Sequence, residues 1–227
     1  MTGLSLSEVL GELRELEDPH MRVVNEKRGD GHAVNLSSLR AFAKQLGTQH
    51  ELALDLWATG DSAAKLLSTL LCCPRALKFS DLDAMLRTAE TPKVRDWLVN
   101  YVVKKSPHCE TLRAAWLMDP DPVVASAGWM LTTTRVVKDP DGIDLAGLLD
   151  VIEAEMKSAP ELLQWAMNEC LGNIGIKHPA HRSRAIGIGE RLGVLKDYPT
   201  PPNCTSPFVP VWVAEVVGRR ERQQGHW

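Results

Sequence analysis

Several features that would assign this chain to a well-known class are scarce or missing. It has five cysteines in 227 residues, an odd number without regular spacing, which argues against a disulfide framework. No apolar run reaches the roughly 18 residues that a membrane-spanning helix needs. The acidic, amphipathic N-terminus lacks the basic start and apolar block of a secretory signal. We therefore expect a cytoplasmic protein with buried free thiols and no contact with a membrane.

The usual signatures of cofactor and catalytic sites are also missing. The sequence contains no Walker loop, dinucleotide-binding glycine motif, nucleophile elbow or HExxH motif. His178, His181, Cys170 and Cys204 belong to metal-binding residue types, but their spacing fits no strong zinc pattern. We expect neither a metal nor another cofactor. The net charge of −3 gives no global attraction for nucleic acid, so a basic surface would have to be local.

The stretch from Gln49 to Leu71 predicts the architecture of the whole chain. Its apolar residues recur at helical spacing in two runs, which indicates two antiparallel helices. Gly60 suits the left-handed end of the first helix, and Asp61 suits the N-cap of the second. Such a pair has too much apolar surface to stand alone. It is therefore expected to stack on similar pairs.

Most of the remaining sequence supplies such helices. Asp18-Pro19 is expected to end the first helix of the chain. The polar stretch from Met21 to Gly31 ends in residues that are typical of a loop. Further helices are expected over residues 5–17, 36–46, 79–88, 93–105, 109–118, 123–137, 145–157, 161–174, 179–192 and 211–222. The predicted fold is all-α: a right-handed superhelical stack of antiparallel helical pairs, forming one domain over residues 1–227. A proline-rich segment, 197–210, precedes the last helix, and the concave surface of the stack is the expected binding site.

The helix predicted over residues 93–105 carries one polar stripe at steps of three and four. Its members are Lys93, Asp96, Asn100 and Lys104. Two lysines around a carboxylate and an amide would place one acid among phosphate contacts. The alternative, which spacing alone favours, is a solvated face with a local ion pair. Trp97 lies beside this stripe, either as the edge of the core or as an exposed stacking surface.

Tryptophans recur on three consecutive helices that are expected to line the concave surface. Trp129 either stacks on a base or sugar or packs in a second layer behind the surface. Trp165 shares a stripe with Asn168 and Glu169 on the helix that follows. Together with Trp97, these residues favour a binding cleft.

Several segments resemble, in order, the AlkD-type DNA alkylation-repair proteins, which are DNA glycosylases built from HEAT-like helical repeats. These segments are AVNLSSLRAFAKQL, HELALDLWATGDSAAKLLSTLL, VRDWLVNYVVKKSPH, VVASAGWMLTTTRVV and LLQWAMNECLGNIGIKHP. The resemblance covers nearly the whole chain and implies a HEAT-like α-solenoid. The closing DYPTPPNCTSPF is similar to the end of one branch of that family.

The resemblance implies a locally basic DNA groove in which an aspartate stabilises the sugar cation as an N3- or N7-alkylated purine leaves. The implied DNA contacts are Lys93, Trp97, Lys104, Lys105, Trp129, Arg135, Trp165, Asn168 and Glu169.

This chain departs from the family pattern at three places. The catalytic aspartate of the family falls at Asn100, or at Tyr101 if the alignment shifts by one, and its catalytic-site arginine falls near Ser126. The tryptophan expected on the later inner helix falls nearest Glu169. Asp96, one turn before Asn100, is the acid that remains. If excision occurs, we expect Asp96→Asn to abolish it and Asn100→Asp to raise its rate.

The sequence therefore predicts a DNA-binding protein of the alkylation-repair type, acting as a monomer on double-stranded DNA. Base excision is a further expectation that depends on Asp96 or Asn100. The alternative is a catalytically inactive helical-repeat scaffold that binds a protein or peptide in its groove. The net acidity favours the scaffold slightly, and the family resemblance favours DNA more strongly.

Overall fold

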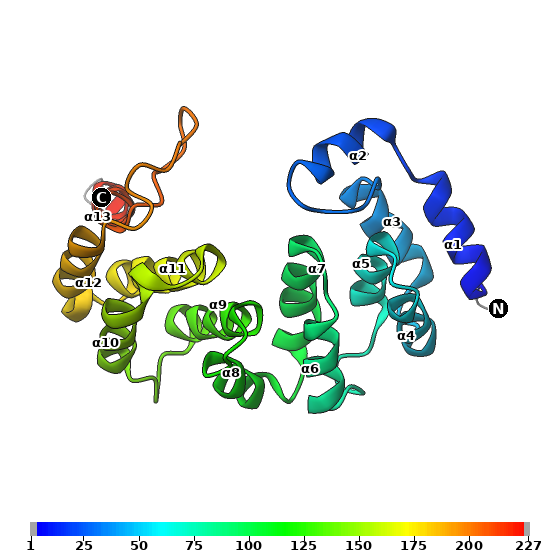
Figure 1. The fold of residues 1–227 in the computed structure, drawn as a ribbon, viewed down its shortest axis with the longest axis horizontal. Helices are drawn as coiled ribbons and strands as arrows, with labels where there is room; N and C mark the ends of the chain where they lie inside the picture. The colour runs from blue at the N-terminus through cyan, green and yellow to red at the C-terminus, as the bar shows by residue number, and fades with distance from the viewer. Residues whose placement is uncertain (1–3, 225–227) are drawn as a thin grey trace. The chain divides into compact units, whose positions relative to one another are not determined.

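A computed structural model describes residues 4–224, and these residues are mostly helical (Figure 1). Apart from one isolated bridge between Glu17 and Val34, the described part of the chain has no β-pairing. The all-α prediction is confirmed. Within the same residues, no helix has the length and apolar character to cross a membrane. The chain divides into two compact units, Met1–Leu112 and Arg113–Trp227, and a single repeat domain stays a prediction.

From residue 4 onward, the described part of the first unit contains seven α-helices and the start of an eighth. They are α1 (Leu6–Glu15), α2 (Pro19–Glu26), α3 (Leu36–Leu46), α4 (His50–Ala58), α5 (Ser62–Leu71), α6 (Phe79–Arg87), α7 (Pro92–Trp97) and the first residues of α8 (Cys109–Leu117). A π-helical turn, Leu98–Val102, and a 3₁₀ turn, Val103–Lys105, continue α7.

Helices α4 and α5 form the antiparallel pair that the sequence predicts. Gly60 has a φ of +78°, and the carboxylate of Asp61 accepts the backbone N–H of Ala64 at 2.8 Å. The two helices pack against each other, with Leu56 and Leu67 fully buried. Because each cap satisfies backbone groups that would otherwise lack partners, the turn between the helices is fixed by its own sequence.

Helix α2 is an element that the sequence pattern does not reveal. Asp18 caps it by accepting the N–H of His20 at 2.8 Å, and Pro19 occupies its first turn. The same Asp-Pro pair therefore follows one helix and starts the next. The only residue that α2 buries is Asn25, so the helix carries no apolar stripe for a periodicity argument to find.

The predicted helix over residues 93–105 is not one regular α-helix. After Trp97 the backbone widens into the π turn, in which the N–H of Val103 reaches the carbonyl of Leu98, five residues back. A 3₁₀ turn then tightens the end at Lys105. Such wide turns insert one residue into a helix and are frequent at functional sites.

The second unit contains the rest of α8 and five longer helices. They are α9 (Pro122–Lys138), α10 (Leu145–Glu155, followed by the 3₁₀ turn Met156–Ser158), α11 (Glu161–Lys177), α12 (Pro179–Leu192) and α13 (Val209–Gln224). Helix α11 packs against α9, α10, α12 and α13, so it is the centre of this unit (Figure 1). Its buried side chains, among them Leu171 and Ile174, form one core with Leu149, Ile152 and Ile188.

Candidate functional site

The polar stripe on the distorted helix of the first unit is a ladder of hydrogen bonds. The Asn100 side-chain amide donates to the Asp96 carboxylate at 2.7 Å and to the Asp96 backbone carbonyl at 2.9 Å. The Lys104 ammonium donates to the Asn100 side-chain oxygen at 2.7 Å. These three residues are half-buried. The amide thus holds the carboxylate on one side and the ammonium on the other.

Lys93 is not a member of this ladder. Among the described residues, no ion pair joins Lys93 to Asp96. The backbone N–H of Lys93 donates instead to the buried carboxylate of Asp30 at 2.8 Å. A carboxylate at this position satisfies an unpaired N–H at the start of α7. The loop after α2 therefore anchors the start of the site helix.

An arginine that the sequence reading did not single out completes a cationic cluster. The Arg40 guanidinium lies over the Trp97 ring, 4.6 Å from its centroid, and donates to the Tyr101 hydroxyl at 3.3 Å. The Lys105 ammonium lies 5.6 Å from the Tyr101 ring centroid. We call Arg40, Lys104 and Lys105 the cationic cluster. Arg40 and Lys105 are exposed, so their charges face solvent.

Trp97 itself belongs to the core of the first unit. Only 3% of its surface is exposed, and it meets Tyr101 edge to face, with ring centroids 5.2 Å apart. Of the two roles that the sequence left open, the structure shows the packed one. The face of its indole orients the Arg40 guanidinium by a cation–π contact. No local pattern signals Arg40, since α3 reaches α7 only through the tertiary fold.

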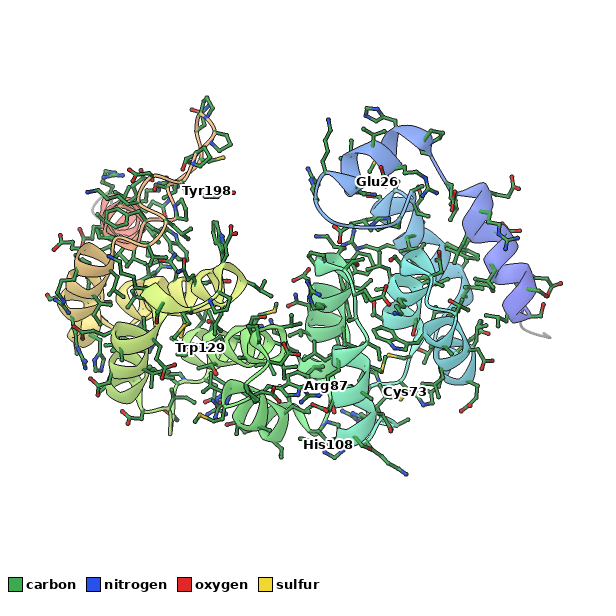
Figure 2. All side chains as sticks on the ribbon, in the orientation of Figure 1. Glu26, Cys73, Arg87, His108, Trp129 and Tyr198 are labelled. Carbon is green, nitrogen blue, oxygen red and sulfur yellow. The ribbon has the colours of Figure 1, made fainter. Side chains whose placement is uncertain are left out.

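In the second unit, two residues predicted to bind DNA have structural partners. Trp129 is 3% exposed and packs in the core of this unit (Figure 2). Arg135 donates to the Asp141 carbonyl at 2.8 Å and pairs with the Asp139 carboxylate at 3.3 Å, which ties it to the loop after α9. The second-layer role considered for Trp129 is therefore the one observed, and the contacts described for Arg135 lie within its own unit.

The other three predicted residues of this unit do come together, at a pocket of about 260 Å³. Trp165, Asn168 and Glu169 line it from α11, and Trp212 lines it from α13. The remaining wall is the segment 205–207, which the sequence reading left without a role. Tyr198, labelled in Figure 2, meets Trp165 edge to face with ring centroids 4.9 Å apart.

Two cysteines are buried in the cores of the units and lack nucleophilic character. Burial raises the pKa of Cys72 to about 11 and the pKa of Cys170 to about 12. Both thiols therefore stay protonated at neutral pH. In residues 4–224, no group of three His, Cys, Asp or Glu side chains is placed to hold a metal ion.

Comparison with known proteins places these features in a family. Residues 9–198 match the family model described as DNA alkylation repair enzyme, and the chain belongs to this family. No curated protein matches the chain. A solved structure described as "a new family of proteins related to the HEAT-like repeat DNA glycosylases with affinity for branched DNA structures" is similar, with a TM-score of 0.75 and 21% identity. The match covers 98% of this chain and 95% of that one, which confirms a HEAT-like helical fold.

Proposed function

We propose that the protein binds DNA and that the cationic cluster of the first unit contacts phosphates. The observation that carries this proposal is that Arg40 and Lys105 contact Tyr101, while Lys104 bonds to the neighbouring Asn100. Membership of the alkylation-repair family supports it, as does the affinity for branched DNA named for the similar structure. A net charge of −3 makes such a local cluster necessary, because the chain as a whole repels a polyanion.

The contacts within the cluster favour binding because they hold two of its charges in place. Arg40 is fixed by Trp97 and Tyr101, and Lys104 is fixed by Asn100. Side chains that are already ordered lose less conformational entropy when they meet a phosphate. Each phosphate that they neutralise releases counterions, so binding must weaken as salt rises.

The test is a charge reversal, Lys104→Glu with Lys105→Glu, measured by fluorescence anisotropy on a duplex between 50 and 200 mM salt. We expect affinity at low salt to fall at least tenfold and the slope of log K against log salt to become shallower by about 2. Lys78→Glu with Lys157→Glu makes the same change in net charge at two exposed positions outside the cluster and should keep most of the affinity. Equal losses in both variants would remove the cluster from the binding surface. If the unmodified protein binds no DNA, the protein-binding scaffold becomes the better interpretation.

Excision of an N3- or N7-alkylated purine is a second candidate function, favoured by the 2.7 Å hydrogen bond from Asn100 to Asp96. This contact fixes a carboxylate beside the cationic cluster, where it is able to oppose positive charge developing on a DNA sugar. One such electrostatic group is worth about 3–4 kcal/mol of barrier, or a factor of 10² to 10³ in rate. Release of N7-methylguanine from a methylated duplex is the assay, and Asp96→Asn should lower the rate by this factor while leaving DNA affinity unchanged.

The hydrogen bond changes what we expect of Asn100→Asp. The sequence alone predicts a faster reaction, because the substitution restores the acid of the family. In the structure, however, the new carboxylate would stand at hydrogen-bond distance from Asp96. Two carboxylates this close share one proton, which raises the higher of their two pKa values. We therefore expect the pH profile of excision to shift to higher pH. A simple increase of the excision rate at pH 7 is not expected. Full excision by Asp96→Asn would exclude Asp96 from the reaction.

A further inference from the structure

The pocket beside Trp165 is lined partly by residues inside the region that the family model matches and partly by residues beyond it. The family match ends at residue 198, whereas Thr205, Ser206, Pro207 and Trp212 line the pocket from beyond that point. The matched region therefore accounts for only part of the lining of this pocket. We propose that it binds an unpaired nucleobase of DNA, an inference that rests on the proposed DNA binding.

The walls of the pocket suit a flat, aromatic ligand. Trp165 and Trp212 line the pocket and are both half-buried, so each side chain keeps some exposed area. An ideal Cβ built on Gly172 would lie 2.3 Å from the Trp212 ring, so that ring rests directly on the backbone of α11. Aromatic side chains of this kind bind single-stranded nucleic acids by stacking on the bases, whatever the sequence.

Charge and size narrow the choice of ligand further. Among the described residues that line the pocket, Glu169 is the only ionisable one, and it is acidic, so the pocket disfavours a phosphate. Its volume of about 260 Å³ lies below the roughly 300–1,000 Å³ of pockets for drug-sized ligands. The hydroxyl of Ser206 and the carboxylate of Glu169 are the kinds of group that hydrogen-bond to base edges. A single base satisfies these limits, whereas a nucleotide with its phosphates does not.

The segment that forms the outer wall is held in place before any ligand arrives. The Asn168 side-chain amide donates to the Pro207 carbonyl at 3.0 Å. The Thr205 hydroxyl donates to the Glu215 carboxylate at 2.8 Å, and Arg219 donates to the Thr205 oxygen at 2.9 Å. The hydrogen bond from Thr205, aided by Arg219, lowers the pKa of Glu215, so this carboxylate stays charged and keeps its partners at neutral pH. A preformed wall lowers the entropy that binding costs.

The experiment uses the full chain and two DNA duplexes. One duplex carries a single bulged 2-aminopurine, and the other is fully paired. 2-Aminopurine is a base analogue whose fluorescence is quenched by stacking. We expect quenching on binding and an affinity for the bulged duplex at least about fivefold above that for the paired duplex. Trp165→Ala should abolish both effects, Trp165→Phe should restore part of them, and Leu162→Ala, an exposed position on the same helix, should change neither.

A titration with the free 2-aminopurine nucleoside separates this inference from the proposed DNA binding. Quenching by the unmodified protein that Trp165→Ala removes supports the pocket even if no duplex binds. Duplex binding without preference for the bulge, together with no response to the nucleoside, overturns the pocket and leaves the DNA-binding proposal standing. A preference for the bulge that survives in folded Trp165→Ala also overturns it. Absence of both kinds of binding overturns both proposals.

Discussion

The two units place their candidate sites by different means. In the first unit the site helix departs from α geometry, and the π turn Leu98–Val102 contains Asn100, the middle residue of the ladder. In the second unit α9 and α11 are regular over 17 residues each, and glycines let their neighbours approach. An ideal Cβ on Gly128 would lie 2.4 Å from the backbone nitrogen of Leu117, whereas one on Gly11 of the first unit would meet nothing within 4 Å.

This difference shows which substitutions each unit tolerates. A site on a distorted helix depends on a few side-chain hydrogen bonds, so point changes there alter function more than stability. A site between closely packed helices depends on how near the helix backbones lie to each other. Adding one methyl group there changes both the stability of the fold and the shape of the pocket. Three predictions follow this contrast, from the largest expected effect on stability to the smallest.

Gly128→Ala should cause the largest loss of stability. Its new Cβ would meet the backbone of Trp116 and Leu117, which moves only if α8 and α9 separate. We expect the free energy of unfolding to fall by about 3 kcal/mol, the upper end for overpacking. Gly11→Ala is the matched control in an open part of α1 and should raise stability by up to about 1 kcal/mol. Urea denaturation followed by circular dichroism measures both, and equal effects would contradict the contrast between the units.

Gly172→Ala should lower stability less than Gly128→Ala does, but it should change the pocket more. The new methyl group would meet the ring of Trp212, a side chain that is able to rotate away, instead of a backbone. We expect a loss of about 1–2 kcal/mol together with altered tryptophan fluorescence. In Gly187→Ala, the new methyl group meets only the flexible end of Arg191, and the spectrum should not change. Identical spectra for the two variants would mean that Trp212 does not rest on α11.

His32 should give the first unit a mild sensitivity to acid. Burial lowers the pKa of His32, an effect that Asp30 and Asp61 oppose and Lys93 assists; Asn25 is its hydrogen-bond neighbour. The pKa of His32 in the folded protein lies below its unfolded value near 6.5. The contribution of His32 to the free energy of unfolding is therefore fully present above about pH 6.5 and is lost as the pH falls through the folded pKa.

His32→Gln should therefore flatten the dependence of the melting temperature on pH between about 7 and 5. The exposed His20, changed in the same way, should leave the dependence as it is. The prediction fails if both variants follow the unmodified protein.

Local signals in the sequence were sufficient for most of the fold. Caps such as Asp61 and Thr91, and breaks such as Gly60, act on their own neighbours, so a pattern argument finds them. Helix α2 was not predicted because it buries a polar residue, Asn25, in place of an apolar stripe. The π turn was not predicted because its wide hydrogen bonds require no particular residue type.

The sites were less predictable because their geometry is tertiary. Spacing alone placed Asp96, Asn100 and Lys104 on one stripe, and the structure joins them by hydrogen bonds. Spacing did not reveal Arg40, which reaches Trp97 from α3. It also did not reveal that a proline-rich segment forms the wall opposite Trp165.

The position of that wall has a consequence for how such a protein diversifies. Residues 203–207 are exposed or half-buried and lie outside the region that the family model matches. Mutations there add or remove recognition groups while the packed layers of α9 and α11 stay unchanged. A change of residue in this segment would therefore alter the lining of the pocket without disturbing the core of the second unit.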